Sequence, residues 1–298
     1  MDATMQAETS PLLRLPTELR LIIYEHLLLP FVSTNAAGEI NTPKRGPRIT
    51  ASEYHEYEMG SNSNAFASGP RTLRIRTMDP TSLPPTRRTK YHIRSDRFRT
   101  RTTMTTYALQ QNPGLHTAIL QTCRQCHAEA AELLYSSYTF DFDTHVEAVI
   151  PFLADLTPIA RASISSVALI KRALPYVKEF DRAEWHSACE YMATELTIPT
   201  LRLSLGVVAG KPGPNGWVDV PELTVDHFRL VQPRSAIAGV EFEWAEQLMW
   251  MRGLRAMHVR AIIEHCPPPE SETMAFWVSF SKSIEGAFSD WIRGIMLA

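Results

Sequence analysis

The sequence is poor in cysteine, in net charge and in long apolar runs, and each shortage excludes a class of protein. Four cysteines in 298 residues are too few for a disulfide-stabilised secreted scaffold. A formal net charge of −2 argues against a surface devoted to nucleic acid. No window reaches the roughly 18 consecutive apolar residues of a membrane span, and the first twenty residues lack a secretory signal pattern. We therefore expect an intracellular protein, cytoplasmic or nuclear, that does not enter a membrane.

Sequence motifs for common enzyme chemistry are also missing. Gly210-Lys211 is followed by Pro212, where a phosphate-binding loop requires Ser or Thr. Neither a G-x-S-x-G nucleophile turn nor an H-E-x-x-H zinc helix is present. We therefore predict that the protein is not an enzyme and that it has no catalytic residues, cofactor-binding residues or cofactor.

The cysteines and histidines give only weak metal signals. Cys123, Cys126 and His127 match the C-x-x-C-H string of haem attachment, but positions i and i+3 of a helix share a face, so two core cysteines explain the same letters. A zinc site needs four ligands. His186 and Cys189 could supply two more, yet an amphipathic helix explains their spacing as well. We predict no metal site.

Two acidic motifs have structural explanations. His127-Ala128-Glu129 matches the H-x-E of zinc deaminases, but the P-C-x-x-C that follows in those enzymes is absent. Asp141 and Asp143 flank Phe142 in a segment that alternates polar and apolar residues, which is typical of a half-buried strand.

The most informative stretch is LLRLPTELRLIIYEHLL, residues 12–28. Pro16 suits the first turn of a helix that we expect over residues 16–29. One apolar face follows the 3.6-residue period: Leu19, Ile22, Ile23, His26, Leu27. Leu21, Tyr24 and Leu28 make a second side apolar. Such a helix is either buried on both sides within its own domain or covered in part by a partner.

Residues 31–112 lose all periodicity and are rich in Ser, Thr, Asn, Pro and Gly, which predicts a disordered insertion. Within it, residues 71–101 carry ten Lys and Arg against two Asp. This basic segment, with Tyr91 and Phe98 interleaved, is interpreted as a solvated linker; a phosphate-binding segment or a nuclear-localisation signal is the alternative.

Periodic order returns at Pro113. A helical segment over residues 113–137 leads into alternating strands and helices over residues 138–298, with strands expected near residues 138, 164, 201 and 255. This alternation predicts an α/β fold, with α+β as the alternative, and a small, largely parallel sheet. Residues 1–11 are expected to be a flexible tail.

The segment at residues 12–30 resembles the first helix of an F-box. The matching residues are Leu15, Pro16, Glu18, Leu19, Ile23, Tyr24, His26 and Leu27. Residues 113–137 resemble the second half of the box. There Cys123-Arg124 matches, Cys126 replaces a tryptophan, and Leu134-Tyr135 stands for Leu-Trp. Arg20 lies where an F-box often has leucine.

The two segments together resemble a fungal family of F-box-like proteins of unknown function. Its signature pairs LPxELRxxIYxxLL with CRQ…EA..LLY…F.F, and both parts are present here. The resemblance implies an adaptor that lays an amphipathic helix into the groove of a Skp1-type protein of a cullin ubiquitin ligase. The implied partner-binding residues are Leu15, Pro16, Leu19, Ile22, Ile23 and Leu27. The alternative is a non-catalytic α/β scaffold whose first helix is core and whose basic loop serves nuclear targeting or nucleic-acid contact.

Overall fold

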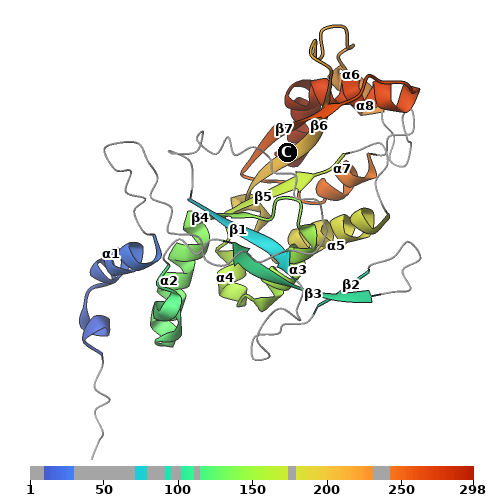
Figure 1. Ribbon diagram of the computed structural model, residues 1–298. Coiled ribbons are helices and arrows are strands. Elements are labelled where there is room, and N and C mark those ends of the chain that lie inside the picture. The colour runs from blue at the N-terminus through green and yellow to red at the C-terminus, as the bar shows by residue number, and fades with distance from the viewer. Residues whose placement is uncertain are drawn as a thin grey trace, which may run out of the picture. The chain divides into compact units, whose positions relative to one another are not determined.

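The computed structural model describes residues 10–29, 71–78, 91–94, 102–110, 115–173, 179–230 and 242–298. The chain divides into two compact units (Figure 1). The first, called here the helical unit, falls within Met1–Pro70 and Pro113–Ala130. The second, the sheet unit, falls within Arg71–Asn112 and Ala131–Ala298.

The helical unit contains the two segments that resemble an F-box. Its elements are η1 (Pro11–Arg14), α1 (Thr17–Leu28), η5 (Thr117–Gln121) and the first half of α2 (Arg124–Ser137). Pro16 is the N-cap residue of α1, and its carbonyl accepts hydrogen bonds from the backbone N–H groups of Leu19 and Arg20. The helix expected over residues 16–29 is thus present. Although more than 80 residues separate α1 from η5, the His116 N–H donates to the Leu27 carbonyl at 3.1 Å, so the chain returns to the end of α1.

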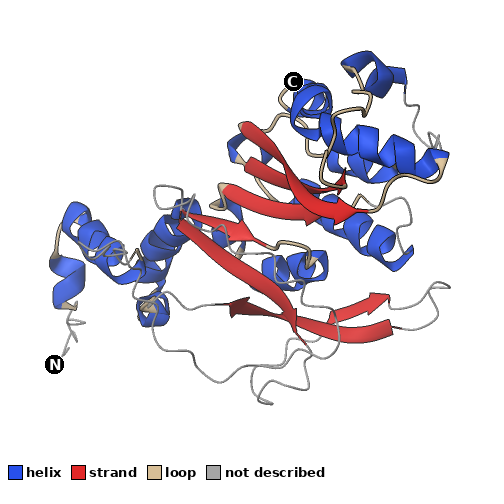
Figure 2. Ribbon diagram, turned by 45° about the horizontal axis from the view of Figure 1, so that its top comes forward, coloured by secondary structure: helices blue, strands red, loops and turns tan. Residues whose placement is uncertain are grey.

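The sheet unit is built on a mixed, largely parallel sheet, shown in red in Figure 2. Seven strands are found in the part of the chain that the structure describes: β1 (Arg71–Met78), β2 (Tyr91–Arg94), β3 (Thr102–Gln110), β4 (Tyr138–Asp141), β5 (Ser166–Lys171), β6 (Arg202–Pro212) and β7 (Ala256–Cys266). Their order is β2-β3-β1-β4-β5-β6-β7. The neighbours from β1 to β7 pair in parallel, whereas β3 pairs antiparallel with β1 and β2. The predicted α/β class is confirmed.

Helices connect the parallel strands, as the alternation in the sequence predicts. Within the described residues, the helices between β4 and β7 are α3 (Val149–Asp155), α4 (Pro158–Ala162), α5 (Glu179–Glu195), α6 (Val225–Leu230) and α7 (Glu243–Leu248). Helices α8 (Glu272–Ser283) and α9 (Ser289–Met296) follow β7. Ring contacts join α7 to α8, because Phe242, the N-cap residue of α7, lies 5.1 Å from Phe280 of α8 between ring centroids. The short turns η6 (Val146–Ala148) and η7 (Ile198–Thr200) precede α3 and β6.

The contact between α8 and β6 is close because β6 carries a glycine. A Cβ atom placed on Gly210 would lie 2.2 Å from the ring of Trp277, so only a residue without a side chain fits there. The Gly210 N–H also donates to the hydroxyl of Ser281 on α8 at 2.9 Å. The side chain of Trp277 and that of Ser281 are both buried. The helix is therefore fixed to the strand by packing and by a buried hydrogen bond.

The predicted disordered insertion over residues 31–112 is wrong where β1, β2 and β3 lie. In β1, Leu73 and Ile75 are buried and alternate with Arg74 and Arg76, so a strand pattern underlies the basic composition. These strands belong to the sheet, and the α/β domain therefore does not begin at residue 138. The rest of residues 31–112 lies outside the described residues, as do residues 1–9 of the predicted tail; Ser10 and Pro11 are described.

Two predicted helices are interrupted. Residues 113–137 form η5 and then α2, with Thr122 and Cys123 between them. The last helix, expected over residues 271–296, is broken by the π-helical segment η8 (Ile284–Phe288). Gly286 there has φ −97° and ψ −111°, which is not helical. The apolar stripe continues across the break, because Trp277, Ile284 and Phe288 are all buried.

None of the helices in the described ranges is long and apolar enough to cross a membrane.

Candidate functional site

Helix α1 shows a row of aliphatic side chains to solvent. Leu19 is 47% exposed and Ile22 is 49% exposed, and because they are three residues apart on one helix their side chains are neighbours on its surface. Pro16 is also exposed. Leu15, Ile23 and Leu27 flank this row and are half-buried. All six residues singled out in the sequence therefore retain solvent-accessible surface, and none belongs to the buried core.

The opposite face of α1 is the one turned inward. Arg20, Tyr24 and Leu28 recur at i, i+4 and i+8, and each is buried, with Tyr24 and Leu28 fully covered. The interpretation of α1 as a helix buried on both sides is wrong, because one apolar side is covered and the other is not. We call the outer row, Leu19, Ile22, Ile23 and Leu27, the docking face.

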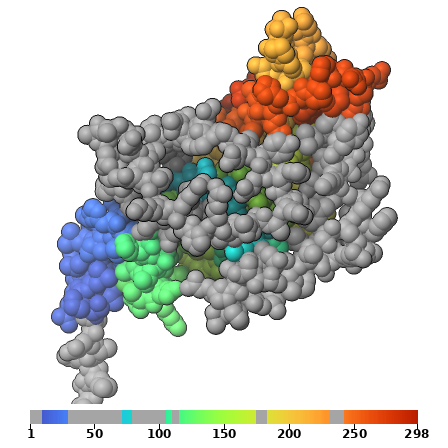
Figure 3. All heavy atoms as spheres, in the orientation of Figure 1, coloured from blue at the N-terminus to red at the C-terminus, as the bar shows by residue number. Residues whose placement is uncertain are grey.

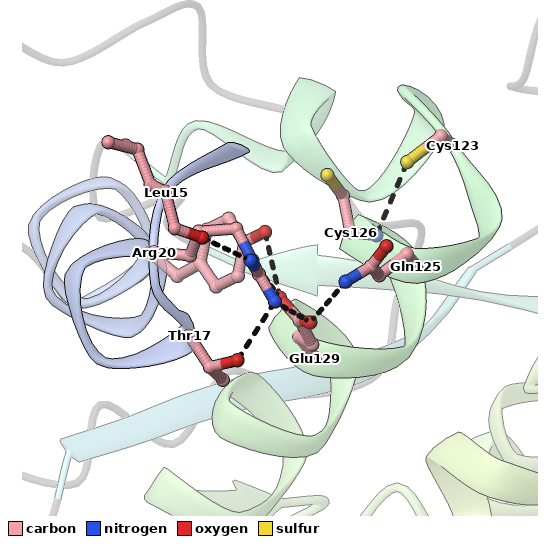
Figure 4. A network of polar contacts seen from close by, with 8 residues as sticks. Leu15, Thr17, Arg20, Cys123, Gln125, Cys126 and Glu129 are labelled. Carbon is pink, nitrogen blue, oxygen red and sulfur yellow. Dashed lines mark hydrogen bonds and ion pairs between the residues drawn. The ribbon is translucent and has the colours of Figure 1, made fainter. Parts of the chain in front are cut away.

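A bidentate ion pair between Arg20 and Glu129 joins the inner face of α1 to α2 (Figure 4). The Nε of Arg20 donates to Oε2 of Glu129 at 2.9 Å, and its Nη2 donates to Oε1 at 2.6 Å. Parallel hydrogen bonds of this kind fix both the distance and the orientation of the two groups. The side chains of Arg20 and Glu129 are only 6% and 19% exposed.

The same guanidinium group also holds the beginning of its own helix. Its Nη1 donates to the carbonyl oxygen of Leu15, and its Nη2 donates to the hydroxyl of Thr17 at 3.0 Å. Leu15 and Pro16 form the turn by which the chain enters α1. Arg20 therefore links three points: this turn, the first helical residue, and Glu129 on α2 (Figure 4).

Two further residues complete the network around Glu129. The Tyr24 hydroxyl donates to Oε2 at 3.1 Å, and Nε2 of Gln125 donates to Oε1 at 3.0 Å. The hydrogen bonds from Arg20, together with those from Gln125 and Tyr24, lower the pKa of Glu129 to about 2 against the opposing effect of burial. Burial raises the pKa of Tyr24, as do the neighbouring Cys126 thiol and the Glu129 carboxylate.

This arrangement is suited to positioning rather than to proton transfer. A carboxylate with a pKa of about 2 remains ionised near neutral pH and is a poor general base. Both of its oxygens are occupied by donors from Arg20, Tyr24 and Gln125. The network instead fixes the rotation of α1 about its own axis, which determines that the docking face points away from α2. In Figure 3 the surface of residues 10–29, in blue, lies beside the pale green surface of η5 and the start of α2.

Arg20 and Glu129 were not among the residues that the sequence singled out. Arg20 was identified only as a departure from the F-box pattern, and Glu129 only as part of an incomplete deaminase motif. A signal was present nonetheless. Arg20 is a charged residue on the apolar, buried face of α1, Glu129 is a half-buried residue of opposite charge, and they lie in the two motifs that together carry the family resemblance.

The Cys-x-x-Cys-His motif lies at the beginning of α2. Cys126 is buried, whereas Cys123 is partly exposed and immediately precedes the helix. Nδ1 of His127 is 2.9 Å from the carbonyl oxygen of Leu120. Burial of both cysteines was expected, and the structure bears this out for Cys126 only.

His186 and Cys189, the second pair of possible metal ligands, lie in two different environments. Cys189 is buried in the core of the sheet unit, and burial raises the pKa of its thiol to about 12. His186 is exposed, and its ring packs edge-on against Trp250 with 4.9 Å between centroids. Among the described residues, no group of three or more His, Cys, Asp and Glu side chains is placed to hold a metal ion.

The acidic pair at the end of β4, Asp141 and Asp143, forms ion pairs with two arginines of β1. Asp143 lies 3.0 Å from Nη2 of Arg76, and Asp141 lies 3.9 Å from Nε of Arg74. Oδ1 of Asp141 accepts a hydrogen bond from the N–H of Asp143, whose φ of 52° places it in the left-handed region. Arg74 and Arg76 of the basic segment thus form ion pairs within the sheet unit. Residues 79–90 and 95–101 of that segment lie outside the described residues.

Comparisons of the chain with protein-family models, with curated proteins and with solved structures give no match.

Proposed function

We propose that this protein is an F-box-like interaction adaptor that acts without a catalytic step of its own. The docking face of α1 binds the groove of a Skp1-type protein, and the sheet unit presents a second protein to the ubiquitin ligase so assembled. The proposal places the protein in the cytoplasm or the nucleus, where such ligases act.

The observation that carries the proposal is the exposure of Leu19 and Ile22. Burying a large aliphatic side chain is worth about 1.5–3 kcal/mol relative to leaving it in water. Leu19, Ile22, Ile23 and His26 have the i, i+3, i+4, i+7 spacing by which an amphipathic helix anchors in an apolar groove. A partner that covers this row supplies the burial that the chain itself does not.

The ion pair between Arg20 and Glu129 gives the proposal its second support. Binding costs less free energy when the binding surface is already in its bound conformation. Because Arg20 fixes both the Leu15 carbonyl and Glu129, the turn into α1 and the rotation of the helix are set before a partner arrives. The position at which the sequence departs from the F-box pattern thus helps to present the docking face.

The sheet unit has exposed apolar side chains of its own that suit it to carry a second protein. Val218 and Leu230 are 76% and 78% exposed, and Ile159 and Trp250 are exposed as well. Single exposed apolar side chains are common on folded proteins, so these residues mark positions available for contact rather than one continuous patch.

The test is the affinity of the full chain for a purified fungal Skp1-type adaptor, measured by isothermal titration calorimetry. Wild type is expected to bind. The single changes Leu19→Asp and Ile22→Asp are each expected to weaken binding at least about tenfold, since each places a carboxylate in an apolar groove. Val218→Asp is the matched control, because it makes the same change at an exposed apolar residue of the sheet unit.

Two results would contradict the proposal. One is the absence of heat or complex formation with wild type at the highest attainable concentrations. The other is equal affinity of wild type, the two α1 variants and Val218→Asp. Circular dichroism of each variant verifies that the chain is folded, and unfolding of Leu19→Asp would favour the alternative in which α1 belongs to the core.

A further inference from the structure

Two cysteines form a close pair where α2 begins. Cys123 immediately precedes the helix, and Cys126 lies in its first turn, three residues further on. The backbone N–H of Cys126 donates to Sγ of Cys123 over 3.4 Å. Figure 4 shows both side chains beside the network around Glu129. All four cysteines of the chain are free thiols in the structure.

The two thiols differ in the way that thiol–disulfide chemistry requires. Cys123 is partly exposed and can meet a reagent from solvent, whereas Cys126 is 2% exposed and is shielded from it. An accessible first cysteine can start the exchange, and a covered second cysteine can complete it within the same chain. Positions three residues apart on a helix are neighbours, and Cys123 is held at the start of α2 because its carbonyl accepts a hydrogen bond from the His127 N–H at 2.9 Å.

The environment also selects Cys123 among the cysteines of the chain. Hydrogen bonds from the backbone N–H and the thiol of Cys126 lower the pKa of Cys123, because they stabilise a thiolate at the positive end of the helix. Burial instead raises the pKa of Cys189 to about 12, and burial raises that of Cys266 as well. Cys123 is thus the thiol of these three that is favoured to ionise.

We propose that Cys123 and Cys126 form a thiol–disulfide exchange site whose co-reactant is a low-molecular-weight disulfide such as oxidised glutathione. This site goes beyond the proposed adaptor function and does not depend on it. A disulfide here would be a reversible modification in the helical unit rather than a structural crosslink.

The exchange proceeds in two balanced steps. The Cys123 thiolate attacks one sulfur of oxidised glutathione, the S–S bond of that molecule breaks, and a glutathione thiolate leaves and takes a proton from water. Cys126 then loses its proton to solvent and attacks Sγ of Cys123, which forms the Cys123–Cys126 disulfide and releases the second glutathione. Overall, two protein thiols lose two electrons, and one oxidised glutathione becomes two reduced glutathiones.

The first measurement uses the wild-type chain and needs no variant. The reduced protein is treated with iodoacetamide at pH 7, and the alkylation of each cysteine is followed by peptide mass spectrometry. Cys123 is expected to react at least about tenfold faster than Cys266, since the thiolate is the reacting form. Equal or slower reaction of Cys123 would overturn the proposal.

The second measurement equilibrates the full chain in buffers of reduced and oxidised glutathione, followed by acid quenching. Wild type is expected to form a Cys123–Cys126 crosslinked peptide without a lasting adduct. Cys126→Ser should instead retain one glutathione on Cys123, and Cys123→Ser should form neither product. A lasting adduct on wild-type Cys123, or no reaction at either residue, would contradict the site.

Discussion

Arg20 on α1 holds Glu129 on α2 through two parallel hydrogen bonds of 2.9 and 2.6 Å, although 109 residues separate them in the sequence. This pair decides which side of an apolar helix faces inward. Tyr24 and Leu28 follow Arg20 onto the covered side, and Leu19 and Ile22 remain in solvent. The function proposed for the protein depends on that division.

The first prediction concerns how strongly the Arg20–Glu129 pair holds α1 against α2. Arg20→Ala, Glu129→Ala and the double variant are expected to speed hydrogen exchange of the α1 amides. The double variant should be little worse than either single one, because each single change already removes the pair and leaves its partner without a counter-charge. Hydrogen-exchange mass spectrometry of the peptide that covers α1 measures the effect.

Arg229→Ala is the control for this double-mutant cycle of Arg20 and Glu129. Arg229 pairs with Asp226 at 3.1 Å on the surface, where the two side chains are 69% and 80% exposed. Exposed pairs of this kind contribute little. If the effects of Arg20→Ala and Glu129→Ala simply add, or if Arg229→Ala matches them, the ion pair does not hold α1.

The second prediction is a dependence of α1 on acid. The folded chain keeps the pKa of Glu129 at about 2, below its ordinary value of 4.5, so the ionised carboxylate stabilises the folded state. This contribution is fully present above about pH 4.5 and is lost as the pH falls toward 2. NMR signals of the α1 amides should therefore shift over that window.

Glu129→Gln provides the control, because it keeps the shape of the side chain but cannot titrate. The α1 signals of this variant should lack the acid-dependent step. A midpoint near 4.5 in wild type, or the same step in Glu129→Gln, would show that the carboxylate is not held as the structure has it.

The third prediction tests the packing of α8 on β6. Gly210→Ala is expected to destabilise the protein by about 1–3 kcal/mol, since the new methyl group would overlap the Trp277 ring. Gly294→Ala in α9 is the matched change, with no atom within 4 Å of its Cβ, and should gain about 0.5–1 kcal/mol from helix propensity. Urea unfolding of both variants measures the difference, and equal stability would contradict the contact.

The fourth prediction compares the two faces of α1 in the isolated protein. Leu28→Asp buries an unpaired carboxylate and is expected to reduce helicity or to release α1, whereas Leu19→Asp should leave the melting temperature nearly unchanged. Thermal unfolding by circular dichroism, together with hydrogen exchange of α1, distinguishes the two. A loss of stability with Leu19→Asp as large as that with Leu28→Asp would mean that the outer row is covered.

Much of the fold could be predicted because its signals are local. The periodicity that predicts α1, the alternation at residues 138–142 and the Leu repeat in β6 each depend on residues a few positions apart. The orientation of α1 could not be predicted in this way. Both of its sides are apolar, and the choice between them depends on Glu129, which is distant in the sequence.

Strand β1 was missed for a different reason. Its sequence, RTLRIRTM, alternates as a strand should, but the arginines and the polar residues around it resemble a solvated linker. Arg74 and Arg76 form ion pairs with Asp141 and Asp143. These aspartates lie at the end of β4, which is a neighbour of β1 only in the folded protein. Charges that are neutralised by distant residues cannot be distinguished in the sequence from charges that face water.

The most direct test of the proposed docking face is a hydrogen-exchange footprint of the full chain with and without the Skp1-type adaptor. We expect slower exchange in the peptides that cover residues 15–28 when the adaptor is added, with the β5 and β6 peptides unchanged. Unaltered exchange in α1 at saturating adaptor, or protection confined to the sheet unit, would contradict it.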